Sequence, residues 1–302
     1  MDLHVMEGYR YAILPGFFHE GPTTPEQSQA VMPVCGSWTV LKNQLKALRI
    51  EHPRSQIKLL LLTRHGEHNA LCEKLVPATL GLSAADHLER SRRSTTNSRS
   101  NQVGREWPLF DPSLSAAGTK QVNQLGVTVR QQVERGMPVP KHYVSPARRA
   151  VQTWAGVWSN VGEGEVSATV IEELREELHV HLCNARRNVS LLQAELSQLV
   201  IPADTSEVDP LWQPSSDCRY DRADAPLPPQ LLERPMRGME NGREMALRAE
   251  KALNRIMDDS GESACKSVTS HCSLLREMMG VLGSLRRDLR TGEMCAVVVK
   301  VD

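Results

Sequence analysis

The sequence predicts an α/β fold: a three-layer sandwich in which helices flank a mostly parallel central sheet, with loop insertions over the C-terminal strand ends. The first observation behind it is the run IKLLLLT at residues 57–63, which is apolar without alternation, as in a parallel strand buried on both faces. The second is that shorter apolar segments then alternate with segments of helical periodicity. The length of 302 residues suits one such domain with insertions.

Residues 1–52 are expected to form an N-terminal arm that packs on the α/β domain of residues 53–302. The arm mixes aromatic residues with four prolines, a composition that favours turns over long regular elements. Near its end, three leucines at helical spacing predict a short amphipathic helix: Leu41, Leu45 and Leu48. Beyond the first strand, the pattern predicts strands at 142–144, 166–171, 267–270 and 296–301, and helices at 147–158, 244–257 and 274–282.

Two stretches break this alternation and are interpreted as insertions at about 84–106 and 202–238. The first contains the polar run SRRSTTNSRSNQ, which has no periodicity. The second is rich in proline, with seven of the 18 prolines of the chain between residues 202 and 235. We expect the residues that select the substrate to lie in these two insertions.

Composition and charge exclude several classes of function. Lys and Arg together number 36, as do Asp and Glu, so no basic field attracts nucleic acid or an anionic membrane. Aromatic residues make up 4% of the chain, too few for a base-stacking platform. The sequence shows neither an apolar run of the roughly 18 residues that span a membrane nor a secretory signal pattern. We therefore expect a cytoplasmic protein without a nucleic-acid or membrane partner.

The first candidate site follows the first predicted strand directly, in the sequence Thr-Arg-His-Gly. A strand that delivers Arg64, His65 and Gly66 to its C-terminal end places them where open α/β sheets bind ligands. Gly66 allows a sharp turn, and Arg64 offers a fork of donors suited to phosphate. An unprotonated imidazole can attack phosphorus, and neighbouring positive charge would lower the pKa of His65 and keep it neutral.

Two further junctions between a strand and a helix carry Arg or His. Pro146 suits the start of a helix, so Arg148 and Arg149 fall near a helix N-terminus, where the dipole favours an anion. Two arginines at such a place are best explained by a bound anion. The segment VTSHCSL ends another strand at His271. Each junction alone also fits a structural role, but the three together indicate an anion site.

An acidic segment at residues 171–178 supplies candidates for a proton donor. Ile171, Leu174 and Leu178 predict the apolar face of a helix that leaves the glutamates on its other sides. The following residues, HVHLC at 179–183, alternate possible zinc ligands. No fourth ligand follows at a telling spacing, so no metal site is expected.

These motifs together resemble the histidine phosphatase superfamily in its phosphoglycerate mutase-like branch, and within that branch the fungal phosphoglycerate mutase-like proteins. The resemblance runs from about Gln56 to Val301. It is carried by LLTRHGEHNA, DPSLSAAG, VSPARRAVQT, LREELHVHLCNAR and VTSHCSLLREMM, which follow one another in the order of the family.

The resemblance implies a role for each matching residue and implies no cofactor or metal. His65 would be transiently phosphorylated, and Glu176 would protonate the leaving oxygen, with Glu173 and Glu177 as rival acids. The phosphoryl oxygens would be held by Arg64, Arg149 and His271. The further candidates for substrate binding are Gly66, Asn69 and Arg148.

Three positions depart from the family pattern. Two residues separate Gly66 from Asn69, where the family commonly has four; His179 stands where relatives often have Gly, and Asn184 where many have Asp. The leading hypothesis is a metal-independent phosphatase that hydrolyses a small phosphorylated metabolite through a phosphohistidine. The alternatives are a phosphomutase, which would return the phosphoryl group to its substrate, and a catalytically weak family member that binds a phosphorylated ligand or a protein partner.

Overall fold

The computed structural model describes residues 8–18, 34–68, 110–161, 164, 166–179, 181–213, 238–259 and 263–302. Its strands are β1 (Tyr11–Leu14), β2 (Gln56–Arg64), β3 (Lys141–Val144), β4 (Ala168–Val170), β5 (Leu199–Val200), β6 (Cys265–Ser270) and β7 (Met294–Val301). Its helices are α1 (Trp38–Glu51), α4 (Ala116–Glu134), α5 (Arg148–Trp158), α6 (Val189–Glu195), α8 (Gly242–Asp258) and α9 (Cys272–Val281), with short 3-10 turns at Glu172–Leu174 and Leu182–Asn184.

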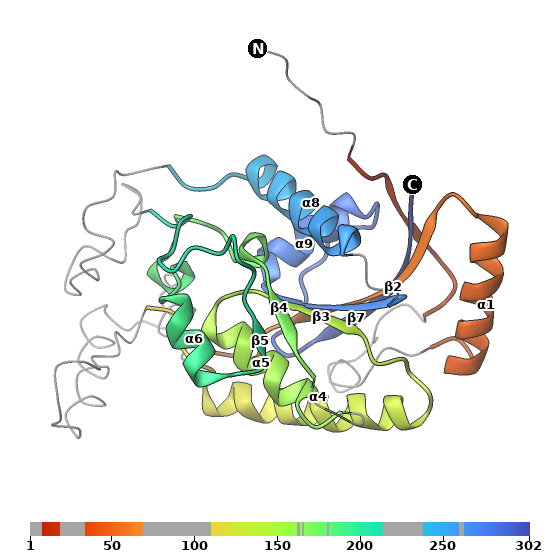
Figure 1. Ribbon diagram of the computed structural model, residues 1–302, viewed down its shortest axis with the longest axis horizontal. Helices are drawn as coiled ribbons and strands as arrows, with labels where there is room; N and C mark the ends of the chain where they lie inside the picture. Colours follow the sequence, from red (N-terminus) through yellow and green to blue (C-terminus); the bar gives the residue numbers. More distant parts are fainter. Residues whose placement is uncertain are drawn as a thin grey trace, which may run out of the picture.

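The strands form one mixed sheet in the order β1-β7-β2-β6-β3-β4-β5. Strands β2, β6, β3, β4 and β5 are parallel to their neighbours in this series, whereas β7 runs antiparallel to both β2 and β1. Helices cover both faces of the sheet, with α8 and α9 on one side and α4 and α5 on the other (Figure 1). This is the mostly parallel three-layer α/β fold that the sequence predicts.

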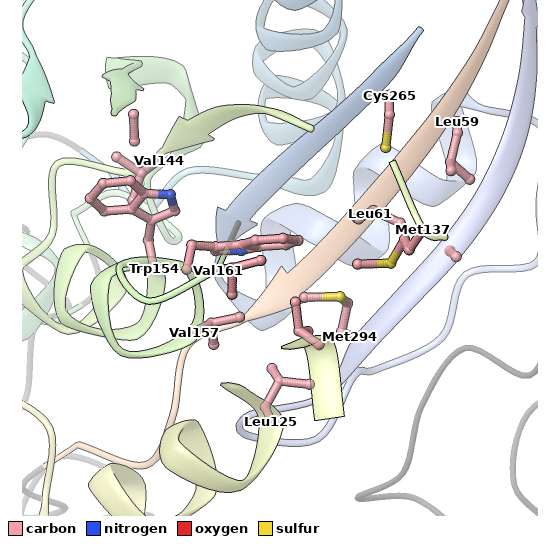
Figure 2. Close-up of a cluster of buried hydrophobic side chains, with 14 of the residues drawn as sticks. Leu59, Leu61, Leu125, Met137, Val144, Trp154, Val157, Val161, Cys265 and Met294 are labelled. Atoms are coloured by element: carbon pink, nitrogen blue, oxygen red, sulfur yellow. The ribbon is translucent and has the colours of Figure 1, made fainter. Parts of the chain in front are cut away.

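Strand β2 lies between β7 and β6 in the sheet, and its side chains contribute to the hydrophobic cores on both faces. Leu59 and Leu61 point into the core formed with α1, α4 and α5, where Leu61 lies near Met137 and Met294 (Figure 2). Leu60 and Leu62 point the opposite way, into the core formed with α8 and α9. Because successive side chains of a strand alternate between the faces, an uninterrupted apolar run is what two cores require.

The N-terminal segment contains more regular structure than its composition suggests. Tyr11 to Leu14 form an edge strand that pairs antiparallel with β7, with Tyr11 opposite Val301. The helix α1 forms as predicted, and its Leu41 and Leu45 are buried. The boundary between arm and domain at residue 52 stays a prediction.

The helix predicted for residues 171–178 is wrong. The structure has only a 3-10 turn at Glu172–Leu174, after which Arg175 is extended, with φ −75° and ψ 162°. The buried positions of Ile171, Leu174 and Leu178 produce the apolar spacing that suggested a helix. Arg248 of α8 donates hydrogen bonds to backbone carbonyls of this segment. These carbonyls therefore do not need the backbone amides that a helix would provide.

Several sequence predictions fall outside the described residues. They include Asn69, the insertion at 84–106 and most of the proline-rich insertion at 202–238. Among the helices of the described ranges, none has the length and apolar character needed to cross a bilayer.

Candidate active site

The three strand-to-helix junctions meet at the C-terminal edge of the sheet. His65 follows β2, and its amide donates to the carbonyl of Ser270 in β6 across 3.0 Å. Ser145 follows β3, and its amide donates to the carbonyl of Thr269 in β6, also across 3.0 Å. His271 follows β6 directly, and its ring centroid is 5.0 Å from that of His65. The parallel register of these strands therefore brings the predicted residues together.

Two contacts fix the tautomer of the buried His65 ring. Its Nδ1 lies 2.7 Å from the carbonyl oxygen of Gly66, and its Nε2 lies 3.3 Å from Nε of Arg149. A guanidinium can only donate, so Nε2 must accept and Nδ1 must carry the proton that is donated to Gly66. The nitrogen with the lone pair is therefore the one beside Arg149.

The surroundings of His65 keep its ring neutral. Burial lowers its pKa well below the usual 6.5, and the charge of Arg149 and the nearby His68 and Arg64 lower it further, against the hydrogen bond to Gly66. The pKa of His271 is lowered in the same way, by burial first and then by Arg149. The expectation of an unprotonated nucleophile near positive charge therefore agrees with this geometry.

Arg149 is a buried cation whose hydrogen-bond acceptors are all neutral. Its side chain is 1% exposed. Besides His65 it donates to the carbonyl of Cys183 at 2.7 Å, to Oδ1 of Asn184 at 3.1 Å and to Nδ1 of His271 at 3.2 Å. Burying a charge is unfavourable unless an opposite charge pairs with it. A bound anion would therefore stabilise this cation.

The two other fully buried arginines of the described residues have carboxylate partners. Arg175 binds both oxygens of Asp209, at 2.5 and 2.6 Å. Nε of Arg186 binds Oε1 of Glu172 at 2.6 Å. Arg149 differs from these two arginines, because within the described ranges no carboxylate forms an ion pair with it.

His271 contacts Arg149 through one ring nitrogen and Ser145 through the other. Nδ1 accepts from the guanidinium, so the neutral ring carries its proton on Nε2, which lies 2.8 Å from Oγ of Ser145. His271 is also the N-cap residue of α9. The positive end of the α9 dipole thus faces the same place as the guanidinium.

Arg64 and Arg148, both predicted to bind phosphate or substrate, are held by neighbours of their own. Nη1 of the half-buried Arg64 donates to the carbonyl of Leu289 at 2.8 Å. The side chain of Arg148 pairs with Glu195 on α6, with contacts of 3.0 Å from Nε and from Nη2. Arg149, rather than Arg148, is therefore the arginine turned toward His65.

Asp111 occupies the N-terminus of α5, where the sequence led us to expect a bound anion. Its Oδ1 accepts from the amide of Arg148 at 2.8 Å, and its Oδ2 lies 3.4 Å from Nε of Arg187. Burial raises the pKa of Asp111, while the Arg148 amide and the charges of Arg187 and Arg149 oppose that rise. Sequence reasoning did not single out this carboxylate; its one signal was its place at the start of DPSLSAAG.

Gly66 is required by close packing rather than by a sharp turn. It is absent from the glycines with positive φ, and a Cβ on it would lie 2.9 Å from the carbonyl oxygen of Gly118. A Cβ on Gly118 would lie 1.8 Å from the carbonyl oxygen of Glu67. The amide of Gly66 donates to Oγ1 of Thr153 at 3.0 Å. The loop after β2 is thus pressed against α4 and α5, which fixes the backbone of His65.

The three candidate acids have different surroundings. Glu173 pairs with Lys251 on α8 at 2.7 Å. Oε1 of Glu176 accepts from the amide of Glu177 at 3.1 Å, and its charge adds to the rise that burial causes in the pKa of the Cys272 thiol. Burial and the nearby carboxylates raise the pKa of Glu177.

The two substituted positions of the acidic motif have clear structural settings. His179 has φ +69°, the left-handed conformation that favours glycine, and its Nδ1 accepts from the amide of Gln213 at 3.0 Å. Asn184 accepts a hydrogen bond from Nη2 of Arg149 with the neutral Oδ1 of its side chain. In the part of the chain described here, no three His, Cys, Asp or Glu side chains are grouped so that they could hold a metal ion.

Comparison with known proteins agrees with the resemblance seen in the motifs. No family model matches the chain. A protein of Arthroderma benhamiae named "Probable phosphoglycerate mutase" is 24% identical over 196 residues, which are 64% of this chain and 52% of that protein. "Phosphomutase-like protein 3" of Candida albicans is 22% identical over 252 residues, or 82% of this chain and 67% of that protein. The chain thus spans about half the length of the first relative.

Some solved structures of similar fold are named as phosphatases. The ecdysone phosphate phosphatase of Bombix mori, determined with tungstate, has a TM-score of 0.45 and 15% identity, covering 79% of this chain and 88% of that one. A mycobacterial glucosyl-3-phosphoglycerate phosphatase has a TM-score of 0.38 and 14% identity, covering 76% and 83%. The chain resembles the histidine phosphatase superfamily, and its similarity to the two fungal proteins confirms the phosphoglycerate mutase-like branch as the group it resembles.

Proposed function

We propose that this chain is a phosphatase that hydrolyses a small phosphorylated metabolite through a phosphohistidine on Nε2 of His65. The observation that carries the proposal is the buried guanidinium of Arg149, which contacts only neutral acceptors and lies 3.3 Å from that nitrogen. A phosphoryl group would supply the missing negative charge and bring phosphorus next to the lone pair. The names of the two fungal relatives support phosphoryl transfer, the step that a phosphatase and a phosphomutase share.

The reaction then has two steps. A bond forms from Nε2 of His65 to phosphorus as the bond from phosphorus to the ester oxygen breaks, and a glutamic acid gives that oxygen its proton. The resulting carboxylate then takes a proton from water, which attacks phosphorus as the bond from phosphorus to Nε2 breaks, and inorganic phosphate and neutral His65 are released. Glu176 is the proposed acid because it stands at the matching position of the motif LREELHVHLCNAR.

Fixed positive charge would stabilise the transferring group in both steps. Arg149 would move its hydrogen bonds from the two imidazoles to phosphoryl oxygens, with Arg64 and His271 as further donors. The dianion would offset the depression of the His271 pKa, so that this ring could take up a proton and donate from Nδ1. We propose that no metal ion takes part, and the predicted cytoplasmic location stays a prediction.

The test is phosphate release from a panel of sugar, hydroxyacid and alkyl phosphates in the presence of EDTA. We expect release by the wild type and by His52→Ala, a matched change at the C-terminal end of α1, but none by His65→Ala. Quenched wild-type protein should carry an acid-labile, alkali-stable phosphoryl label. Activity that survives His65→Ala, or that EDTA abolishes, would contradict the proposal.

A phosphomutase is the second candidate, because both curated relatives carry that activity in their names. A mutase would label His65 but return the phosphoryl group to another oxygen of the substrate. It would therefore produce an isomer without free phosphate, which phosphorus NMR of the same reactions distinguishes from hydrolysis.

A further inference from the structure

A buried ion pair joins α8 to the acidic segment, residues 172–178. Arg248 of α8 binds both oxygens of Glu240, at 2.7 and 2.6 Å, and the two side chains are 9% and 6% exposed. The Oε2 atom of Glu240 also accepts from the amide of Leu178 at 3.0 Å. The carboxylate therefore holds both the arginine and one end of the acidic segment.

The guanidinium of Arg248 also donates hydrogen bonds to the backbone of that segment. Nη1 donates to the carbonyls of Glu173 at 3.0 Å and Arg175 at 2.6 Å, and Nη2 donates to the carbonyl of Glu176 at 3.1 Å. These carbonyls would bind amides four residues further on if the segment were the helix that its sequence suggests. One side chain thus replaces the hydrogen bonds of a whole helical turn and sets the path of the backbone on which the acid stands.

The same segment is tied to the phosphate site from its other end. Arg175 Nη2 donates to the carbonyl of Asn184 at 2.5 Å, and the Asn184 side chain accepts from Arg149. Nδ2 of the Asn184 side chain donates in turn to the carbonyl of Glu177 at 2.8 Å. The place of the acid relative to Arg149 is therefore set by neighbours of both.

We propose that Arg248, held by Glu240, is a positioning residue for the proton donor: it fixes the extended backbone of residues 173–176 so that the acid reaches the leaving oxygen. This inference rests on the proposed phosphatase function. It does not depend on which glutamate is the acid, since Glu176 and Glu177 both stand on the held backbone. Arg248 itself touches neither the phosphoryl group nor His65 in this account.

If Arg248 positions the acid, its loss should slow alkyl and aryl esters to different extents, whereas general destabilisation of the fold should slow both. An aryl ester such as p-nitrophenyl phosphate has a leaving group that departs without a proton, whereas an alkyl phosphate needs one. Loss of acid catalysis typically costs about 10²–10⁴-fold. A displaced acid should therefore slow the alkyl ester strongly and the aryl ester little.

The experiment compares Arg248→Lys with Arg243→Lys, the same change at an exposed position in the first turn of α8. Lysine keeps the charge beside Glu240 but cannot reach three carbonyls at once. We expect Arg248→Lys to lose at least 10-fold in kcat on the alkyl ester and less than 3-fold on the aryl ester, with KM unchanged. Arg243→Lys should match the wild type on both.

A second variant provides a test in case Arg248→Lys does not fold. Arg248→Met combined with Glu240→Gln removes the guanidinium without leaving a buried carboxylate unpaired, and it should show the same contrast between the esters. Equal losses on both esters, or no loss on either, in a variant that melts as one transition would overturn the positioning role. A wild type that cleaves neither ester would instead overturn the proposed function and this inference with it.

Discussion

Nε of Arg149 donates to Nε2 of His65 across 3.3 Å, so the cation of the site contacts the lone pair of the proposed nucleophile. This contact explains two properties together. It keeps the lone pair unprotonated, and it places the guanidinium where a phosphoryl group bonded to Nε2 would carry its negative oxygens. In the proposed reaction, an entering phosphate would take over the hydrogen bond and free the lone pair for attack.

The first prediction concerns pH. Burial and Arg149 lower the pKa of His65 well below 6.5, so the folded ring stays neutral until the pH falls well under that value. We expect kcat/KM, which reports the free enzyme, to hold its plateau through pH 6.5 and to fall only at lower pH. The measurement is a pH profile corrected for the titration of the ester, with circular dichroism at each pH. An acid limb centred at or above pH 6.5 would contradict it.

The second prediction concerns ligand binding by Arg149. If its charge awaits an anion, inorganic phosphate should raise the melting temperature of the wild type, by the equivalent of about 2.7 kcal/mol at 100 times the Kd. Arg149→Met should lose this response and about 10²–10³-fold in kcat/KM. Arg243→Met, at an exposed site, should keep both. Differential scanning fluorimetry with sulfate as a comparison anion measures the response, and an unchanged phosphate shift in Arg149→Met would count against the site.

The third prediction tests how the nucleophile loop is held. A Cβ on Gly118 would lie 1.8 Å from the carbonyl oxygen of Glu67, a backbone atom that cannot move without moving the loop after β2. Gly118→Ala should therefore cost about 1–3 kcal/mol of stability and reduce activity beyond that loss. Gly242→Ala, also in a helix but with nothing within 4 Å of the new Cβ, is the control. Equal stability and activity in the two variants would show that the loop yields.

The fold and the core of the site could be predicted because their signals are local. The run that forms β2 is apolar enough to be recognised alone, and strand ends followed by Arg or His mark three junctions. Parallel pairing then makes these junctions neighbours without further information. His65, Arg149 and His271 meet for this reason, although 84 and 122 residues separate Arg149 from the two histidines.

The parts that sequence reasoning missed depend on partners far along the chain. The acidic segment has a helical apolar spacing, yet Arg248, 72 residues after Glu176, takes the carbonyls a helix would need. Asp111 caps a helix that starts 37 residues later. His179 adopts a φ of +69°, a conformation typical of glycine that the backbone preferences of histidine do not predict. Such features follow from tertiary contacts that override local preference.

The last prediction concerns stability and His142, which lies on β3 in the apolar core away from the site. Its ring centroid is 4.6 Å from that of Trp158 and 5.9 Å from that of Trp154, and neither ring nitrogen has a hydrogen-bond partner in the structure as described. Burial lowers the pKa of His142 from 6.5 to about 4. Because the unfolded chain binds the proton first, the resulting stability is full above pH 6.5 and is lost as the pH falls toward 4.

A shift of this size corresponds to about 3 kcal/mol across that pH window. His142→Phe should therefore flatten the dependence of the unfolding free energy on pH between 6.5 and 4, as measured by urea denaturation at each pH. It should not abolish that dependence, since His65 and His271 are also buried and neutral. His52→Gln, a change nearer the surface, should leave the slope as in the wild type. An unaltered slope in His142→Phe would mean that the ring is hydrated or protonated in the folded core.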